Sequence, residues 1–261
     1  MKEIDLVLLT PFSGSFQDLL GSLSNTYDQL EHNDLWLMIL DNQGESTERE
    51  LREQLRQYNK IILLHYRGVK GAGFARNYGL DFLHKKKFQH FLLLPLDADD
   101  ELADGSIQYI KSIFKDKNLS MATFGMVKVW PSGKTEMFAY TGSRSFGDLL
   151  RHYVMPCGST VIRVSDPEIF LNCRFGSRKR ANDLLFFMSC LDNFGSVRCF
   201  ERVVLHYSVG GAPSLSSKKY KMPLYRYLAY RDMGLSRTHG MYYLVIYVVR
   251  NLLRLTSKFR S

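Results

Sequence analysis

The sequence predicts an α/β fold with a mostly parallel central sheet flanked by helices, followed by a basic helical extension at the C-terminus. In the first half, four short apolar runs alternate with stretches of helical periodicity, and this order is typical of an open parallel sheet. Three of the four runs end in a polar or glycine-containing loop. After Pro213 the composition shifts towards Lys, Arg, Tyr and Ser, which indicates a separate extension.

The four apolar runs are short enough to be strands that are buried on both faces of a sheet. They cover residues 4–9, 35–40, 61–65 and 91–96. Ligands of such sheets bind at the carboxyl ends of the strands. The loops in which we expect functional residues are therefore 10–15, 41–46, 67–73 and 97–101.

Helical stretches lie between the runs and after the last one. They cover residues 16–30, 46–58, 73–84 and 104–114. The first of them places Leu19, Leu23 and Leu30 at helical spacing, which indicates one buried face. We expect each helix to pack on the sheet.

The second half is less regular. Residues 122–129 and 135–139 flank the turn Pro131-Ser132-Gly133, a pattern that predicts a β-hairpin. Further strands are expected at 159–164 and 203–207, and a helix at 180–193. We divide the chain into a main domain (1–212), with a first half at about 1–101 and a second half at about 102–212, and an extension at 213–261.

The composition limits the class of protein. The chain of 261 residues is 45% hydrophobic with a net charge of +9, so it can bury a core and favours anionic partners. Its four cysteines form no CxxC pair, and we expect free thiols in a reducing compartment. We find no secretion signal and no apolar run near the ~20 residues of a membrane span. The expected location is the cytoplasm, and no nucleic-acid-binding motif is recognisable.

Four acidic residues follow the fourth apolar run, in the sequence Asp97-Ala98-Asp99-Asp100-Glu101. Carboxylates this close together remain ionised at low cost only in water or beside a cation. Two aspartates spaced by one residue point the same way in an extended segment and can hold one hard divalent ion, Mn²⁺ or Mg²⁺. The alternative is an acidic turn in which Asp99 or Asp100 caps the next helix.

At this point the sequence resembles the family 2 glycosyltransferases of the GT-A fold, of the bacterial surface-polysaccharide type. The resemblance runs over about residues 4–210 and rests on six motifs in the expected order. They are IDLVLLTPF (4–12), LMILDNQG (37–44), GAGFARNYGL (71–80), LPLDADD (94–100), MPCGSTVI (155–162) and ANDLLFF (181–187).

The resemblance implies a donor site for a UDP-sugar. Thr10, Pro11 and Phe12 would form the wall beside the base and ribose, and Asp41 would read the uracil. Arg76 would add charge near the diphosphate, with Asn77 in a structural role. In the DxD element, Asp97 and Ala98 would contact the donor. Asp99 would bind the metal, and His206 is a further metal ligand of lower weight.

The resemblance also implies a catalytic base. Inverting transfer needs a carboxylate that takes the proton of the acceptor hydroxyl, and Asp183 occupies that position at the start of a helix. The family motif is Glu-Asp, whereas this chain has Asn182-Asp183. The loss of the glutamate leaves open whether catalysis is intact. Without the resemblance, Asp183 would be an acidic residue in the first turn of a helix.

Residues 218–261 contain ten Lys or Arg and one acidic residue, Asp232. Arg250, Arg254 and Lys258 recur every four residues and form one stripe of a helix. A basic helix with aromatic residues suits an anionic membrane surface, here the inner face of the cell membrane. Packing of this helix on the catalytic domain and a homodimer contact remain open.

The leading hypothesis is an inverting, metal-dependent transfer of a hexose or N-acetylhexosamine from a UDP-sugar to a glycan or lipid-diphosphate-linked acceptor in cell-surface polysaccharide synthesis. Two alternatives remain. One is a GT-A-like scaffold or binding protein with impaired catalysis. The other is a sugar nucleotidyltransferase, although residues 10–15 (TPFSGS) lack the glycine-rich, lysine-containing loop of that class.

Overall fold

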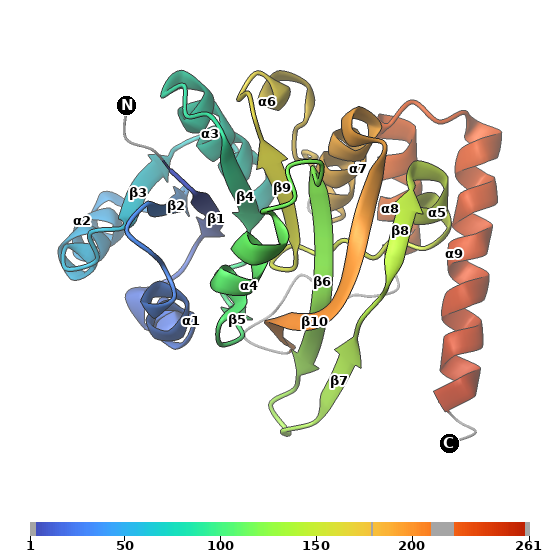
Figure 1. Cartoon of the computed structure of the whole chain (residues 1–261), viewed down its shortest axis with the longest axis horizontal. Helices are drawn as coiled ribbons and strands as arrows, with labels where there is room; N and C mark the ends of the chain where they lie inside the picture. Colours follow the sequence, from blue (N-terminus) through green and yellow to red (C-terminus); the bar gives the residue numbers. More distant parts are fainter. Residues whose placement is uncertain (1–3, 179, 210–221, 259–261) are drawn as a thin grey trace.

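A computed structural model describes residues 4–178, 180–209 and 222–258. One mixed sheet runs through the molecule, in the strand order β3-β2-β1-β4-β9-β6-β10-β5 (Figure 1). Two further strands pair at its side, β7 with β6 and β8 with β10. The predicted α/β class with a central sheet flanked by helices is confirmed.

The first four strands are parallel, as predicted. They are β1 (Leu6–Phe12), β2 (Asp34–Asp41), β3 (Ile61–Tyr66) and β4 (Phe91–Pro95). β1 continues three residues beyond the predicted end. Its polar Thr10 is fully buried, because its hydroxyl accepts a hydrogen bond of 2.9 Å from the indole nitrogen of Trp36. A satisfied hydroxyl can stay inside the sheet at little cost.

Helices cover both faces of this parallel part. On one face lie α1 (Phe16–Asp28), α2 (Glu45–Leu55) and α4 (Ser106–Ile113), and on the other α3 (Ala72–Lys85). The alternation of side chains along β1 separates two cores, with Leu6 and Leu8 in one and Val7 and Leu9 in the other. All four side chains are fully buried.

The second half of the sheet is mixed. Its strands are β5 (Glu101–Leu102), β6 (Met121–Val129), β7 (Thr135–Phe138), β8 (Gly142–Ser145), β9 (Thr160–Val164) and β10 (Ser196–Ser208). β9 is antiparallel to both of its neighbours, whereas β6 and β10 are parallel. The predicted hairpin is confirmed as β6 and β7. Three helices complete this half: α5 (Phe146–Arg151), α6 (Ile169–Asn172) and α7 (Asn182–Phe194).

The C-terminal extension forms two helices that pack on the domain, α8 (Met222–Asp232) and α9 (Arg237–Lys258) (Figure 1). Tyr230 of α8 is fully buried in the core shared with α5 and α7, and its hydroxyl donates to the carbonyl of Leu150 at 3.1 Å. Arg178 forms a two-pronged ion pair with Asp232 at 2.7 and 2.9 Å. Lys218, Lys219 and Lys221 of the predicted basic extension lie outside the described residues.

All four cysteines are buried and free, as the spacing predicted. Among the described helices, none is long and apolar enough to cross a membrane.

Candidate active site

The candidate site lies at the carboxyl ends of the parallel strands. β1 lies between β2 and β4. The chain first adds β2 and β3 on one side of β1 and then crosses to its other side to form β4. Asp41 ends β2, and the acidic segment follows β4 directly. The topology therefore brings two of the predicted donor-site segments to one edge of the sheet.

Three carboxylates gather after β4. Ligand oxygens of Asp97, Asp99 and Asp100 lie within 4.8 Å of one another. Asp99 is exposed, whereas Asp100 is buried and accepts a hydrogen bond of 3.1 Å from the backbone nitrogen of Ser208. The expectation that Asp99 or Asp100 caps the next helix is wrong, because α4 begins at Ser106 with Gly105 as its N-cap. Asp100 is the third member of the cluster.

The electrostatics of the cluster fit a divalent cation. Although Asp99 is exposed on one side, desolvation by the surrounding chain and then the charge of Asp97 raise the pKa of its carboxyl group. Burial and the charges of Asp97 and Asp99 raise the pKa of Asp100 well above its usual range. The second carboxylate oxygen of Asp100 is buried and has no hydrogen-bond partner within the described part of the chain. Hard oxygen ligands with uncompensated charge are the donors that Mg²⁺ and Mn²⁺ prefer. The three aspartates could therefore hold such an ion.

Arg76 connects this cluster to the start of α7. Its guanidinium is buried, forms an ion pair with Asp97 and donates to the side-chain oxygen of Asn182 at 3.2 Å. Its guanidinium carbon lies 5.1 Å from the centre of the Phe175 ring. Arg76 fixes the position of Asp97 through this ion pair. The expectation that Arg76 adds charge near the diphosphate stays a prediction.

Asn182 occupies the position at which the motif predicts a glutamate. Its amide oxygen accepts from Arg76, so it supplies the acceptor but not the charge of a carboxylate. Its backbone carbonyl accepts from Gly176 at 2.9 Å, which ties the 176–182 loop to the helix start. Asn77 braces the same loop through reciprocal hydrogen bonds of 2.9 Å with the backbone of Phe175, in the structural role expected of it.

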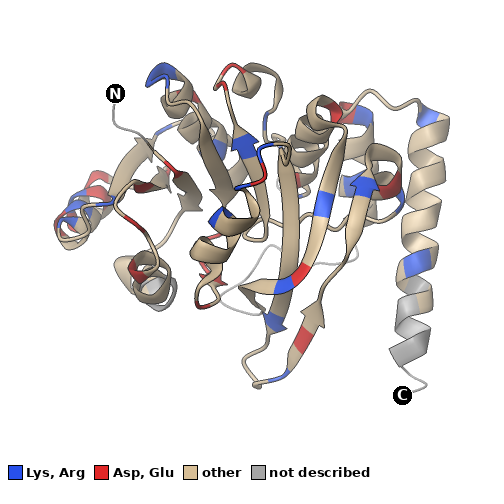
Figure 2. Ribbon diagram, in the orientation of Figure 1, with Lys and Arg blue, Asp and Glu red and all other residues tan. Residues whose placement is uncertain are grey.

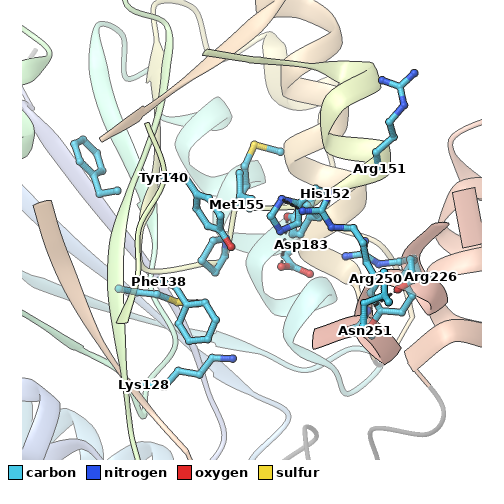
Figure 3. A pocket seen from close by; sticks show the side chains of 17 residues that line it. Lys128, Phe138, Tyr140, Arg151, His152, Met155, Asp183, Arg226, Arg250 and Asn251 are labelled. Atoms are coloured by element: carbon cyan, nitrogen blue, oxygen red, sulfur yellow. Dashed lines mark hydrogen bonds between the residues drawn. The ribbon is translucent and has the colours of Figure 1, made fainter. Parts of the chain in front are cut away.

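Asp183 lies in the first turn of α7 and lines a pocket of about 650 Å³ (Figure 3). Burial raises the pKa of its carboxyl group, while the positive charges of Arg76 and Arg226 act in the opposite direction. The hydroxyl of Tyr153 lies 3.5 Å from its Oδ2. A half-buried carboxylate with a raised pKa that faces a cavity has the properties of a general base.

The pocket is built by elements from distant parts of the chain. Lys128 and Phe138 of the β6–β7 hairpin lie on the opposite side from Arg226 and Arg250 of α8 and α9, and Tyr140, His152 and Asp183 lie between them (Figure 3). The cavity is large enough for a sugar-sized ligand. The C-terminal helices therefore form one wall of the candidate site.

On the donor side, Asp41 is buried and its Oδ2 accepts a hydrogen bond of 2.9 Å from the backbone nitrogen of Gly71. Its Oδ1 is buried without a partner in the described chain, and burial raises the pKa of the carboxyl group. This contact joins the end of β2 to the start of α3. Base recognition by Asp41 stays a prediction.

Thr10, Pro11 and Phe12 lie at the end of β1, and their role as a wall beside the base and ribose stays a prediction. The Thr10 hydroxyl is bound to Trp36, and Phe12 is 4% exposed in the core that faces α1. Both side chains point into the core because alternate residues of β1 share that face. Pro11, which points the other way, is the one of the three that is partly exposed.

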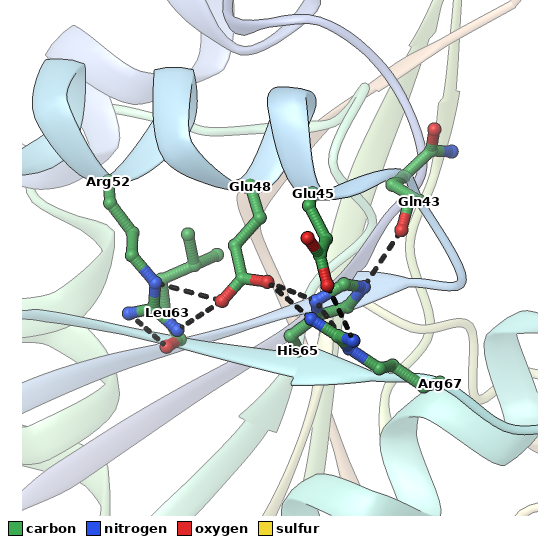
Figure 4. Close-up of polar contacts among 7 residues, drawn as sticks. All are labelled: Gln43, Glu45, Glu48, Arg52, Leu63, His65 and Arg67. Carbon is green, nitrogen blue, oxygen red and sulfur yellow. Dashed lines mark hydrogen bonds and ion pairs between the residues drawn. The ribbon is translucent and has the colours of Figure 1, made fainter.

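A polar network fixes the loop that follows Asp41 (Figure 4). The Nε2 of His65 donates to the carbonyl of Gln43 at 3.0 Å, and its Nδ1 contacts Glu48. Arg52 donates to Glu48 at 2.8 and 2.9 Å, and this contact is the largest of the causes that lower the pKa of Glu48 to about 2. The network holds α2, β3 and the Gln43 loop together.

His206 does not join the acidic cluster. Its strand partner in β5 is Glu101, and the group of potential metal ligands in the described chain contains the three aspartates and no histidine. Side chains alternate along β10, so His206 points away from its neighbour Tyr207. Burial, and then the charges of Asp100 and Asp97, raise the pKa of Tyr207 well above its usual range. Tyr207, rather than His206, faces the carboxylates.

No protein-family model matches the sequence, and no curated protein matches it. Solved structures of S. aureus TarS are similar in fold. The complex of TarS 1–349 with UDP-GlcNAc has a TM-score of 0.68 at 13% identity, over 92% of this chain and 70% of that one. The complex with UDP has a TM-score of 0.63 at 14% identity, over 92% and 70%. A longer TarS structure has a TM-score of 0.64 at 14% identity and is covered over 42% of its length. The chain thus has the GT-A-like fold of TarS.

Proposed function

We propose that this chain is an inverting, metal-dependent glycosyltransferase that moves a hexose or N-acetylhexosamine from a UDP-sugar to a glycan or lipid-linked acceptor in cell-surface polysaccharide synthesis. The single observation that carries the proposal is the position of Arg76. Its guanidinium contacts Asp97 of the acidic cluster and Asn182, the neighbour of Asp183. One buried side chain thus joins the candidate donor site to the candidate base, beside a pocket that could hold an acceptor.

The donor side supports a nucleoside diphosphate. The acidic cluster follows β4 at the switch point of the sheet, where nucleotides bind in open α/β folds. Asp97, Asp99 and Asp100 would hold Mn²⁺ or Mg²⁺, and Asp41 would face the base. When bound, such an ion would neutralise charge on the departing diphosphate. TarS, which shares the fold, binds UDP-GlcNAc and UDP.

The acceptor side supports proton transfer to Asp183. The acceptor hydroxyl oxygen attacks the anomeric carbon, the bond from that carbon to the diphosphate oxygen breaks, and UDP leaves with the bonding pair. The hydroxyl proton passes to the ionised carboxylate of Asp183. Tyr153 orients this carboxylate through its hydroxyl, and burial keeps the carboxyl pKa raised, which strengthens the base.

The test separates donor binding from turnover. UDP with Mn²⁺ is titrated into the protein by calorimetry. Release of the nucleoside diphosphate (UDP, GDP or dTDP) from a panel of UDP-, GDP- and dTDP-sugars is measured with and without EDTA. We expect UDP to bind only with the ion, and UDP-sugars to be the hydrolysed class. Full UDP release by both Asp99→Ala and Asp183→Asn would contradict the assignment. Lys86→Ala, on the exposed end of α3, is a matched control.

A scaffold without catalysis is the second candidate. Its supporting feature was the missing glutamate, but Asn182 keeps the hydrogen bond to Arg76. UDP binding without turnover of any donor or acceptor would favour this scaffold. A sugar nucleotidyltransferase would instead release pyrophosphate from UTP and a sugar phosphate. The segment that would carry its phosphate loop includes Pro11 and Phe12, which belong to β1.

We also propose that α9 docks on an anionic membrane surface, on the cytoplasmic face. Of the predicted basic stripe, Arg250 lines the pocket and donates to His152 at 3.2 Å. The side chains of Arg254 and Lys258 lie outside the described ones. The face of α9 that is available is apolar, between 47% and 63% exposed, and consists of Met241, Tyr242, Val245, Val249 and Leu253. Figure 2 shows how few charged residues the described part of this helix carries.

The membrane proposal rests on the spacing of these side chains and on the net charge of +9. The paired change Val245→Glu and Val249→Glu is expected to abolish co-sedimentation with vesicles that contain phosphatidylglycerol. Leu171→Glu, at an exposed apolar residue of α6, is the control. Equal vesicle binding by the double variant would contradict the proposal. A wild-type dimer that the double variant loses would assign the face to a second copy.

A further inference from the structure

The pocket beside Asp183 has a cationic wall that the transfer chemistry does not use. Arg226 of α8 and Arg250 of α9 line it, and Asp183 is the one carboxylate among the described residues of the lining. The charge of Arg226 acts on Asp183, but within the described chain neither arginine forms an ion pair with a carboxylate within 4 Å. Two guanidinium groups at one cavity wall without a directly contacting carboxylate can bind an anionic ligand.

Arg226 is the more deeply buried of the two arginines. It is 9% exposed, and its Nε is buried without a hydrogen-bond partner in the described part of the molecule. Its guanidinium carbon lies 4.4 Å from the ring centre of Tyr247 and 5.4 Å from that of Tyr153. The rings hold the guanidinium plane but supply no anionic acceptor. A buried charge of this kind is costly unless a ligand pairs with it.

Arg250 adds a second guanidinium from the next helix. It is exposed and donates to the Nδ1 of His152 at 3.2 Å, which directs it towards the pocket (Figure 3). Tyr153, which contacts Arg226, is also the residue whose hydroxyl reaches Asp183. Arg226 is therefore connected to the candidate base through Tyr153, and Arg250 lines the same cavity.

We propose that Arg226 and Arg250 form an oxyanion subsite that binds a negatively charged group of the acceptor, phosphoryl or carboxylate, next to the hydroxyl that reacts at Asp183. This inference rests on the proposed function, whose acceptor class it narrows. Two guanidinium groups match the several oxygens of such an anion through charge-assisted hydrogen bonds. α8 and α9 then belong to the acceptor site and are not a separate appendage.

The test uses three compounds with one carbon skeleton: glycerol 3-phosphate, glycerate and glycerol. Each is titrated into the wild type and into Arg226→Met, Arg250→Met and Arg198→Met by ligand-observed NMR. We expect one or both anions to bind and glycerol not to bind. Each pocket variant should weaken anion binding roughly 10- to 100-fold. Arg198, which pairs with Asp116 outside the pocket, is the matched control and should have no effect.

The anion with the higher affinity identifies the group, phosphoryl or carboxylate. Wild-type affinity in both pocket variants, or no preference for the anions over glycerol, would overturn the inference. Arg250 is exposed, so Arg250→Met is expected to fold. If Arg226→Met does not fold, anion binding by Arg250→Met tests the subsite. UDP binding with Mn²⁺ is measured in parallel. If UDP binds but the wild type shows no preference for the anions over glycerol, only the subsite is refuted. If UDP does not bind, the proposed function is refuted.

Discussion

Gly73→Ala should reduce turnover far more than it reduces stability. Gly73 lies in the first turn of α3, and a Cβ atom there would stand 2.2 Å from the carbonyl oxygen of Gly176. The oxygen has to retreat by about 1 Å to reach an ordinary contact distance. The backbone N–H of Gly176 donates a hydrogen bond to the carbonyl of Asn182. Movement of Gly176 therefore displaces the start of α7 and with it Asp183.

The magnitudes follow from two opposing terms. Overpacking destabilises the folded state by about 1–3 kcal/mol, whereas alanine in place of glycine inside a helix stabilises it by about 1 kcal/mol. The free energy of unfolding should therefore fall by no more than about 2 kcal/mol. A displacement of about 1 Å at a reacting group can cost about 100-fold in rate. UDP release from the best donor of the panel and thermal unfolding measure the two quantities.

Gly79→Ala in the same helix is the matched control. Its Cβ would meet the methyl ends of Leu9 at 2.5 Å and Ile39 at 3.0 Å, which can rotate away. We expect its turnover to stay within about twofold of the wild type, since no backbone segment of the site has to move. Wild-type turnover in Gly73→Ala, with unchanged hydrogen exchange at residues 176–184, would refute the reasoning.

Three further predictions concern charged side chains. Asp183→Asn should lower turnover by about 10²- to 10⁴-fold without weakening UDP binding, and an equal loss of both would argue against a base. The base works when ionised and burial raises its pKa, so the acid limb of kcat/KM should lie above the ordinary value of 3.8 and vanish in this variant. Asp100→Asn should raise the melting temperature in EDTA, because the buried carboxyl with its raised pKa is lost, and should remove any stabilisation by Mn²⁺. Glu48→Gln should cost about 1–2 kcal/mol of unfolding free energy at neutral pH, a value reduced because Arg52 is half exposed. The lowered pKa of Glu48 makes this difference disappear as the pH falls from 4.5 towards 2, which denaturant titrations at several pH values can follow.

The local parts of the fold could be predicted from the sequence. Apolar runs predicted β2, β3 and β4 to within about a residue at each end, because each run is bounded by polar residues. β2 and β4 are buried throughout, whereas β3 lies at the edge of the sheet and is only partly buried. The end of β1 was placed too early, since the partner of Thr10 is Trp36 on the neighbouring strand. The polarity of a single residue does not reveal a partner 26 positions away.

The site was predictable where its chemistry is concentrated in adjacent residues. The acidic segment after β4 is recognisable from its adjacent carboxylates. Whether Asp100 belongs to the cluster or caps α4 could not be predicted, because it depends on where α4 begins, and its N-cap is Gly105. Arg226 and Tyr153 had no such signal. They reach Asp183 only because α8 and the segment after α5 pack beside α7, and no local pattern encodes that packing.

The wall that α8 and α9 contribute also sets an order of maturation during synthesis. The acidic cluster, Arg76 and Asp183 are all translated before residue 210, whereas both arginines of the wall follow it. At a translation rate of about 5–20 residues per second, α8 and α9 follow roughly 2–10 s later. A nascent chain can thus form the acidic cluster and the start of α7 before the pocket beside them has closed. If the proposed anion subsite binds the acceptor, acceptor selection matures after the acidic cluster during synthesis.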